Sequence, residues 1–287
     1  VLINGGSASA SEILAASLKY SYGATIVGQK SFGKGKVQTT GTLEDGTMIK
    51  YTTARWFMPN GECIDELGIN NQLIYFDPET GYKISKFVEG IPLSEVENPD
   101  LYLEEVSKVL HVLHESGLSA QDDYRPYERL NLYQQLVTDF GYQHSEKYFE
   151  LKQIFLSQRT FLDQFPQVIC HNDSQISNMV VEADQTYLLD WEFTGNNDPM
   201  YDVACVGNKE FELALKFLPI YLGREPEKEE SRRLYLWRGF QCLQWHNVAL
   251  YKDLIGLSRD LHLDFNLIAA AYLTKAEQFL SGANQYK

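Results

Sequence analysis

The spacing of apolar residues changes along this chain of 287 residues. Residues 1–69 hold apolar runs of strand length separated by Gly, Ser and Thr, whereas residues 94–287 are dominated by apolar positions at helical spacing. The pattern therefore predicts a strand-rich segment followed by a mostly helical one. An example of the helical spacing is the set Leu103, Val106, Leu110 and Leu113.

In the first segment, residues 1–4 and 24–27 predict two buried strands, and residues 11–20 predict a helix between them. This order is typical of a β-α-β unit. Residues 37–43 and 48–53 flank an Asp-Gly turn, which favours a hairpin because glycine accepts the positive φ that a tight turn requires. We expect a small α/β unit followed by a hairpin.

In the second segment, residues 73–76 and 83–87 predict another hairpin around a turn that contains proline. Helices dominate the rest of the segment. Two short apolar runs interrupt them, at residues 168–171 and 187–190. We expect these two runs to pair with each other as a small β-ladder.

Charge divides the chain at the same place as the apolar pattern. Residues 1–69 carry six basic and six acidic side chains, so the net charge of −14 lies after residue 69. This sign argues against nucleic acid or an anionic membrane as the main partner, and it favours a cationic or metal-bridged ligand. We expect two domains of different origin, residues 1–69 and 70–287.

Other features of the composition bear on the compartment. No apolar run approaches the ~18 residues of a membrane span, and no basic and apolar leader is recognisable. The spacing of the four cysteines does not suggest a metal site, so we expect reduced, mostly buried thiols in a cytoplasmic protein. Because Val1 already lies in a predicted strand, we expect a fragment or a processed chain. The cysteines are Cys63, Cys170, Cys205 and Cys242.

Three motifs stand in a fixed order in the first segment. They are NGGSASASEI at residues 4–13, SFGKGKVQ at 31–38 and TTARWFMPNG at 52–61. In this order and spacing they resemble the C-terminal processing peptidases, serine endopeptidases with a Ser-Lys dyad. The resemblance covers only the end of that family's catalytic domain.

The resemblance to these peptidases implies a role for four residues. Ser9 would be the nucleophile, with the amide of Ala10 in the oxyanion hole, while Lys34 would be the general base and Gln38 would orient it. A serine at a strand-to-helix turn is exposed, and a partly desolvated lysine can lose its proton near neutral pH. The sequence SASE at residues 9–12 also fits a helix capping box, in which Ser9 only satisfies a helix amide. Both interpretations stay open.

The densest chemistry of the second segment is HNDSQISN at residues 171–178, followed twelve residues later by Asp190. Phosphoryl transfer needs a carboxylate to receive the proton of the substrate hydroxyl, and a carboxylate and an amide to hold magnesium against the ATP phosphates. On this basis Asp173 is the candidate base, and Asn178 and Asp190 are candidate magnesium ligands.

These residues resemble the choline kinase and aminoglycoside phosphotransferase family, from about residue 70 to near the C-terminus. Residues 109–114 and 198–204 are further matches, and residues 190–193 and 197–199 look most like bacterial choline kinases. The resemblance implies an α+β, protein-kinase-like fold with a mostly helical C-lobe, here preceded by the small α/β fragment with its hairpins.

The resemblance also implies ATP and Mg²⁺ as cofactors. Residues 82–90 are similar to the strand and hinge beside the adenine in that family, which implies an adenine contact at Lys86, Phe87 and Glu89. His111 and His114 recur on an apolar helical face, so we expect them to pack rather than to catalyse.

A small cationic alcohol such as choline is the expected partner, because aromatic faces and carboxylates hold a quaternary ammonium. We expect Trp191, Glu192, Trp237 and Trp245 to bind it. Trp237 and Trp245 lie eight residues apart on a predicted helix, about 80° from each other, so they can line one pocket. Aromatic residues at this spacing also fit a buried core. The segment further supplies Tyr201, Tyr251 and Asp198.

Three functional hypotheses follow. The chain is a choline-kinase-type phosphotransferase, an incomplete Ser-Lys endopeptidase, or a catalytically silent fusion that retains choline affinity. Most of the kinase family's N-lobe has no counterpart in the sequence. A further hypothesis therefore has the hairpin of residues 37–53 stack on residues 73–87 and bring a lysine to the phosphates. The candidate lysines are Lys30, Lys34 and Lys36.

Overall fold

The chain divides into two compact units, Val1–Val88 and Glu89–Lys287, and each is described here by itself. This division lies further along the chain than the change of composition after residue 69. The computed structural model describes residues 2–3, 27–28, 38–42, 48–52, 73–76, 83–85, 87–120, 123–183 and 185–287.

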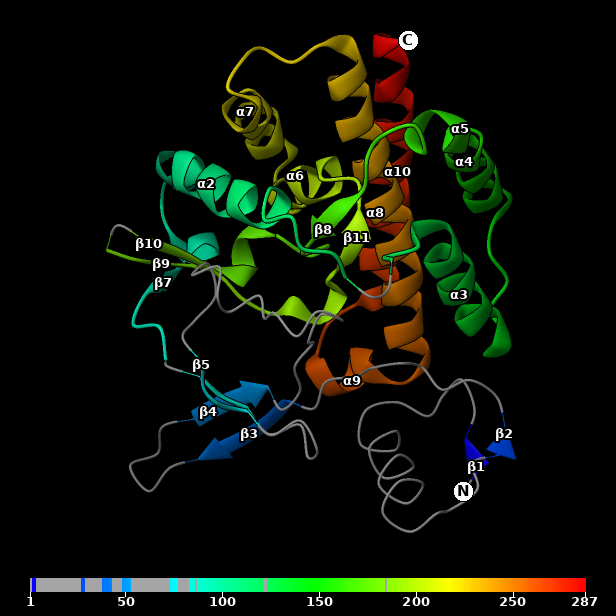
Figure 1. Ribbon diagram of the computed structural model, residues 1–287. Coiled ribbons are helices and arrows are strands. Elements are labelled where there is room, and N and C mark those ends of the chain that lie inside the picture. Colours follow the sequence, from blue (N-terminus) through cyan, green and yellow to red (C-terminus); the bar gives the residue numbers. More distant parts are fainter. Residues whose placement is uncertain are drawn as a thin grey trace. The chain divides into compact units, whose positions relative to one another are not determined.

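The first unit contains the strand pairs that its sequence predicts (Figure 1). β1 (Leu2–Ile3) pairs in parallel with β2 (Val27–Gly28), as a β-α-β unit requires, and the helix predicted between them lies outside the described residues. β3 (Gln38–Thr42) and β4 (Met48–Thr52) form the predicted antiparallel hairpin.

The second predicted hairpin is also present. β5 (Leu73–Phe76) and β6 (Lys83–Ser85) are antiparallel, with an irregular register between Leu73 and Tyr75. β6 contacts β4 of the first hairpin. The strands on either side of residue 69 therefore belong to one unit.

The second unit is mostly helical, as predicted. Short 3-10 helices occur at η2 (Leu93–Glu95), η3 (Pro99–Tyr102), η4 (Ile176–Asn178), η5 (Trp191–Phe193) and η6 (Ala283–Tyr286). The α-helices are α2 (Leu103–His114), α3 (Pro126–Asp139), α4 (Glu146–Leu156), α5 (Arg159–Leu162), α6 (Met200–Val206), α7 (Phe211–Leu222), α8 (Lys228–Leu254), α9 (Leu257–Leu261) and α10 (Phe265–Gly282).

α8 is the central helix of the second unit. It packs against α10 along its length and also contacts α3, α4 and α6 (Figure 1). A helix that is covered on several sides needs apolar or hydrogen-bonded residues all round, which is why α8 has no simple apolar stripe. Gly239 permits the close approach of α10, since a Cβ there would lie 2.7 Å from Cδ2 of Leu280.

α2 confirms the predicted apolar stripe. Leu103, Val106, Leu110 and Leu113 are all buried. A row of residues spaced by three and four faces one side of a helix, and this side packs against α7 and β8. The stripe therefore marks the core-facing side of α2.

The predicted pairing of the two short apolar runs is wrong. β8 (Val168–Cys170) pairs with β11 (Gly195–Asn197), and β10 (Gln185–Leu188) pairs with β9 (Met179–Glu182). β9 and β10 follow each other closely, with Glu182 opposite Gln185, and closing a short loop costs less chain entropy than closing a long one. β7 (Ile91–Pro92) completes the sheet by pairing with the other edge of β9.

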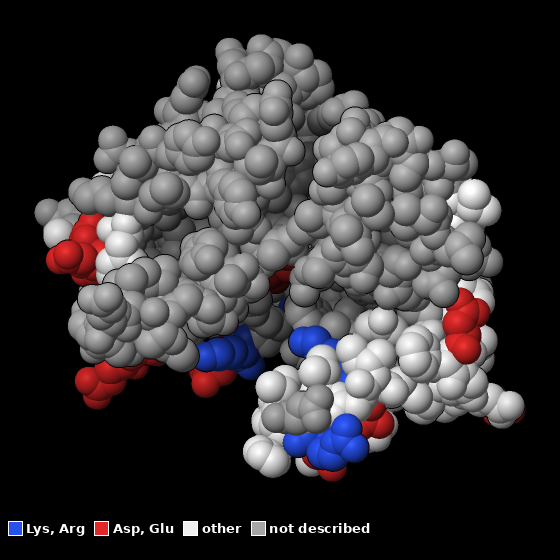
Figure 2. Space-filling view, turned by 90° about the horizontal axis from the view of Figure 1, so that it is seen from below, with Lys and Arg blue, Asp and Glu red and all other residues white. Residues whose placement is uncertain are grey.

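The described cysteines agree with the prediction of buried thiols. Cys170, Cys205 and Cys242 are free and buried, and Cys63 lies outside the described residues. On the face shown in Figure 2, described Lys and Arg side chains lie close to described Asp and Glu side chains. Within the part of the chain that the structure describes, no helix has the length and apolar character needed to cross a bilayer.

Candidate active site

Asp202 of α6 organises the loop that follows β8. Its carboxylate accepts hydrogen bonds from the backbone amides of His171 (2.8 Å) and Asn172 (2.7 Å) and from Oγ of Ser174 (3.1 Å). Nε2 of His114 lies 3.1 Å from the same carboxylate. Burial alone would raise the pKa of Asp202, but the hydrogen bond from His114 and the nearby histidines lower it overall. Asp202 is therefore a support for the loop.

Asn172 gives the loop its turn. Its φ of 62° is left-handed, a conformation that asparagine tolerates better than most residues. The Nδ2 group donates to the carbonyls of Cys170, Phe193 and Gly195. The buried Asn172 thus joins β8 to η5 and β11.

His171 connects the loop to the end of β10. Its Nδ1 accepts from the amide of Asp173 at 3.2 Å, and its Nε2 lies 2.9 Å from the carbonyl of Leu189. Because an amide donates and a carbonyl accepts, the proton of the neutral ring belongs on Nε2. The ring also contacts Trp191 edge-on, at 4.7 Å between centroids. His171 therefore orients Asp173 and does not face a substrate.

Asp173, the candidate base, is held by two side-chain amides. Nδ2 of Asn178 donates to both its Oδ2 and its backbone carbonyl, each at 2.8 Å, and Nε2 of Gln175 donates to Oδ2 at 3.3 Å. Burial, together with the charges of Asp190 and Glu192, raises the pKa of Asp173 to about 7, and the two amides oppose this shift. A carboxyl with a pKa near neutrality suits a general base.

The two candidate magnesium ligands are brought together by the backbone. The amide of Leu189 donates to the carbonyl of Asn178 at 2.8 Å, which joins the end of β10 to η4. Asp190 follows directly with a left-handed φ of 66°. A carboxylate and an amide oxygen are donors that magnesium prefers, so the donor set of Asn178 and Asp190 fits this ion.

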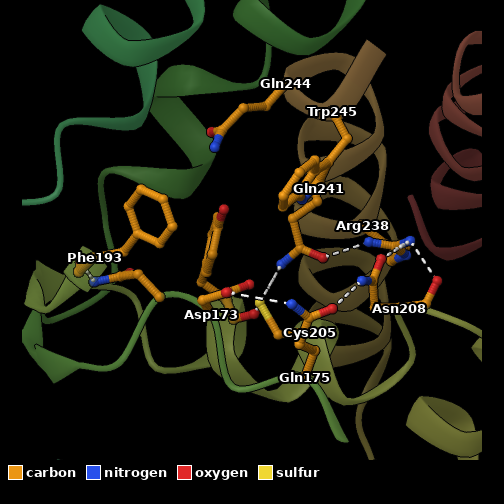
Figure 3. Close-up of a pocket in the computed structure, with 11 residues that line it drawn as sticks. Asp173, Gln175, Phe193, Cys205, Asn208, Arg238, Gln241, Gln244 and Trp245 are labelled. Atoms are coloured by element: carbon orange, nitrogen blue, oxygen red, sulfur yellow. Dashed lines mark hydrogen bonds between the residues drawn. The ribbon is translucent and has the colours of Figure 1, made fainter. Parts of the chain in front are cut away.

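A pocket opens beside Asp173 (Figure 3). Three aromatic rings line it, from Phe193, Tyr201 and Trp245. The remaining lining comes from Asn172, Asp173, Gln175, Cys205, Asn208, Arg238, Gln241 and Gln244.

Of the four residues expected to bind the substrate, Trp245 lies in the lining of this pocket. Trp237 is buried in the core, where its Nε1 donates to Asp198 at 2.7 Å, and it is not among the residues that line this pocket. The physical reason is that α8 is packed on several sides, and an offset of about 80° directs the two rings to different neighbours.

Trp191 and Glu192 lie on η5, outside the lining of the pocket. Nε1 of Trp191 donates to the carbonyl of Leu188 at 2.8 Å. Glu192 acts on Asp173 through its charge. Asp198 is buried and paired with Arg233, so its charge is already neutralised.

Phe193, Gln241 and Gln244 were not predicted to belong to the site, and Tyr201 was predicted only as one of several available aromatic residues. Phe193 is the last residue of the matched stretch 190–193 and directly follows Glu192, so its position was a usable signal. Gln241 and Gln244 lie on α8 at the helical spacing that leads to Trp245. Choosing them required knowledge of which side of α8 faces the pocket.

The remaining predicted site residues are only partly described. Ser9, Ala10, Lys34 and Lys86 lie outside the described residues, and Gln38 is placed in β3 opposite Thr52 without a described side chain. Phe87 is 79% exposed. The backbone amide of Glu89 donates to Glu182 at 2.9 Å, which fastens the start of the second unit to β9.

His111 and His114 make packing contacts with Tyr221 of α7. The His111 ring stacks on it at 4.5 Å, and Nδ1 of His114 lies 2.8 Å from its hydroxyl. His114, Cys170 and Asp202 have ligand atoms within 4.8 Å of one another, but hydrogen bonds already engage them, including one from the Cys170 thiol to the carbonyl of Asn197. These contacts support the loop, in line with the packing role expected for the histidines.

Comparison with known families gives a match for each part of the chain. Residues 67–238 match the phosphotransferase enzyme family, and residues 1–74 match peptidase family S41. The carboxy-terminal processing protease CtpA of Bacillus subtilis is 41% identical over 93 residues, which cover 29% of this chain and 20% of that protein. The chain thus spans about a fifth of the length of this curated relative.

Solved structures resemble the chain in fold. A choline/ethanolamine kinase family protein from Mesorhizobium loti has a TM-score of 0.65 at 18% identity, covering 75% of this chain and 76% of that one. The choline kinase LicA from Streptococcus pneumoniae has a TM-score of 0.60 at 20% identity, covering 76% and 77%. The predicted protein-kinase-like fold, mostly helical with small antiparallel sheets, is confirmed.

Proposed function

Since this chain belongs to the phosphotransferase enzyme family, we propose that it transfers a phosphoryl group from ATP, with magnesium, to the hydroxyl of a small alcohol that carries an ammonium group, such as choline. The observation that carries the proposal is the position of Asp173 in the same pocket as the rings of Phe193, Tyr201 and Trp245. Asp173 and three aromatic rings thus line the same pocket.

Asp173 is the base of the proposed reaction. A hydroxyl in the pocket can donate its proton to the carboxylate, whose position is set by Asn178 and Gln175. A positioned general base contributes about 10²–10⁴-fold to a rate. The remaining acceleration comes from holding the alcohol and the phosphate in line.

Asn178 and Asp190 would hold magnesium, which when bound supplies positive charge to the ATP phosphates. Both residues are anchored through the bond between Leu189 and Asn178. A structure of the similar protein LicA contains AMP, which supports nucleotide use by this chain.

The aromatic wall supports the choice of a cationic acceptor. Ring faces attract an ammonium group within about 6 Å, and a quaternary ammonium needs no hydrogen-bond acceptor. The hydroxyl of Tyr201 lies 2.9 Å from that of Tyr124, and Tyr124 also bonds Gln244 at 3.1 Å, so two of the lining side chains are held in place. A preformed pocket loses less entropy on binding.

The experiment is a calorimetric titration with magnesium and a non-hydrolysable ATP analogue, followed by an ATP-consumption assay with choline and ethanolamine. We expect binding by the full chain, loss of binding in Asp190→Ala, and turnover that disappears in Asp173→Asn. Asn131→Asp is the control, because Asn131 is exposed on α3 and its side-chain oxygen already accepts from Lys152. Absence of both binding and turnover in the unaltered chain would contradict the proposal.

A second candidate function rests on the match of residues 1–74 to peptidase family S41. It predicts peptide cleavage that is lost in Ser9→Ala and is indifferent to Asp190→Ala. A silent fusion predicts neither reaction, but retains choline binding that weakens in Trp245→Leu. Peptide cleavage, ATP consumption and choline binding, each measured on Ser9→Ala, Asp190→Ala and Trp245→Leu, separate these functions.

A further inference from the structure

A chain of hydrogen bonds connects the central helix to the candidate base. Nη2 of Arg238 donates to Oδ1 of Asn208 at 2.9 Å and to its carbonyl at 3.0 Å. Nδ2 of Asn208 donates to Oε1 of Gln175 at 2.5 Å, and Nε2 of Gln175 donates to Oδ2 of Asp173 at 3.3 Å. Figure 3 shows these side chains along one side of the pocket.

The two end groups of this hydrogen-bond chain, Arg238 and Asp173, determine the direction in which its amides donate. A side-chain amide has an NH₂ donor and an oxygen acceptor, and a flip of the amide group exchanges their positions. Asn208 and Gln175 alone would therefore allow hydrogen bonds donated in either direction. Arginine has only donors, whereas an ionised carboxylate has only acceptors. With Arg238 at one end, each amide must present its NH₂ group toward Asp173, and the reversed sense would set the Gln175 oxygen against the carboxylate.

Arg238 is itself held in place by neutral groups. It is 1% exposed, and its Nη1 donates to Gln241 at 2.8 Å. Gln241 in turn donates to the carbonyl of Tyr201 and to the thiol of Cys205, both on α6. Among the described residues, its hydrogen-bond partners are neutral groups, no carboxylate pairs with it, and its Nε has no hydrogen-bond partner. The ring of Phe279 lies 5.8 Å from its Cζ. Burying such a cation is costly, so its place needs a reason beyond packing.

We propose that Arg238 is a positioning residue for the phosphoryl transfer, acting through Asn208 and Gln175 to hold the Asp173 carboxylate in the orientation that receives the acceptor's proton. This inference rests on the proposed function. In that step the acceptor oxygen bonds to the γ-phosphorus, the phosphorus–oxygen bond to ADP breaks, and the hydroxyl proton passes to Asp173. Arg238 touches none of these atoms.

Asn208→Asp is the sharpest test. The new carboxylate still accepts from Arg238, now as an ion pair, but it cannot donate to Gln175, so the direction of the hydrogen-bond chain is lost. We expect kcat to fall about tenfold, the value of one hydrogen bond to a charged group, while the KM values for ATP and for the acceptor stay unchanged. Asn131→Asp is the matched control and should keep the kcat of the unaltered chain.

A second pair of variants tests the arginine. Arg238→Gln replaces a donor-only group by an amide that allows both senses, and we expect the same loss of kcat. Arg238→Lys keeps a donor-only cation, and we expect it to recover most of the rate. If Arg238 acted only in packing, both variants would lose thermal stability equally and Arg238→Lys would not recover kcat. That result would overturn the proposal, as would a normal kcat in Asn208→Asp.

The positioning role can be separated from the proposed function. If the unaltered chain turns over no hydroxylated ammonium compound, the proposed function fails, and the hydrogen-bond chain is judged by NMR. The side-chain amide signals of Gln175, assigned by their loss in Gln175→Met, should shift in Asn208→Asp and stay in place in Asn131→Asp. Identical Gln175 signals in the unaltered chain and in Asn208→Asp would overturn the inference.

Discussion

The backbone amide of Asn172 donates a hydrogen bond of 2.7 Å to Oδ1 of Asp202, across an interval of 30 residues. This bond fastens the loop after β8 to α6, and the other carboxylate oxygen holds the amide of His171. Because Asp202 is fully buried, these bonds are shielded from water. The placement of Asp173 next to the pocket depends on this connection.

We expect Asp202→Asn to lower the free energy of unfolding by about 3 kcal/mol, since it removes a buried charge that accepts several hydrogen bonds. Urea denaturation is the measurement. Asp139→Asn on the exposed end of α3, where the carboxylate accepts from Gln135, should change stability little. Equal effects of the two substitutions would contradict the supporting role of Asp202.

Asn172 combines a left-handed backbone with three side-chain bonds to carbonyls, and two substitutions separate these contributions. Asn172→Gly keeps the backbone conformation and loses the bonds, whereas Asn172→Ala loses the bonds and also strains the backbone. We therefore expect Asn172→Ala to be less stable than Asn172→Gly by about 1 kcal/mol, measured by thermal unfolding.

Ala183 is the matched control for this backbone argument. It has a φ of 51° in the exposed turn after β9. Ala183→Gly should raise the stability by about 0.5 kcal/mol, because glycine adopts this conformation without strain. A loss of stability in Ala183→Gly would show that the left-handed conformation is not a source of strain here.

The two tryptophans of α8 should respond to substitution in opposite ways. Trp245→Leu removes a ring from the pocket, and we expect the KM for the cationic acceptor to rise about tenfold with little change in stability. Trp237→Phe removes the bond to Asp198 in the core, and we expect a stability loss of about 1 kcal/mol with an unchanged KM. Steady-state kinetics and thermal unfolding of both variants check the assignment.

His246 makes the stability of the second unit depend on pH. Burial lowers its pKa from the ordinary value to about 4, and its Nδ1 lies 2.8 Å from the carbonyl of Ala269. A histidine whose pKa is lower in the folded than in the unfolded state binds more protons when unfolded, so stability falls as the pH drops from about 6.5 toward 4. Once the pH is below 4, this pKa shift has lowered the free energy of unfolding by about 3 kcal/mol in total.

The measurement is the free energy of unfolding at pH 7 and at pH 4.5, for the unaltered chain and for His246→Gln. The pH dependence of stability that is lost in His246→Gln belongs to His246. The contribution of Asp173, whose raised pKa makes stability rise as the pH drops, is the same in both proteins. His262→Gln is a suitable control, because His262 is exposed. The same pH dependence in all three proteins would contradict a role for His246.

Much of the fold follows from local sequence pattern. The stripe on α2, the long helix that carries both tryptophans, and both hairpins of the first unit are confirmed, because each depends on residues that are close in the chain. The pairing of β8 with β11 was missed. Residues 168–170 and 195–197 are linked by a long connection, and nothing in their own pattern selects a partner.

The candidate site shows the same division. The spacing of Asp173, Asn178 and Asp190 indicates phosphoryl-transfer chemistry, because the residue types themselves carry it. The lining of the pocket was predicted less well: Trp245 lies in it, while Trp237 lies in the core. Side chains on one buried helix face different neighbours, and only packing decides which of them reach the pocket.

By itself the sequence determined the chemical groups of the site and the local elements that carry them, because both depend on residue type and short-range spacing. Only the tertiary structure decided which groups meet. Asp202 holds the loop of Asn172, and Arg238 reaches Asp173 through Asn208 and Gln175. Contacts between distant segments depend on the packing of whole helices, and a one-dimensional pattern does not contain that information.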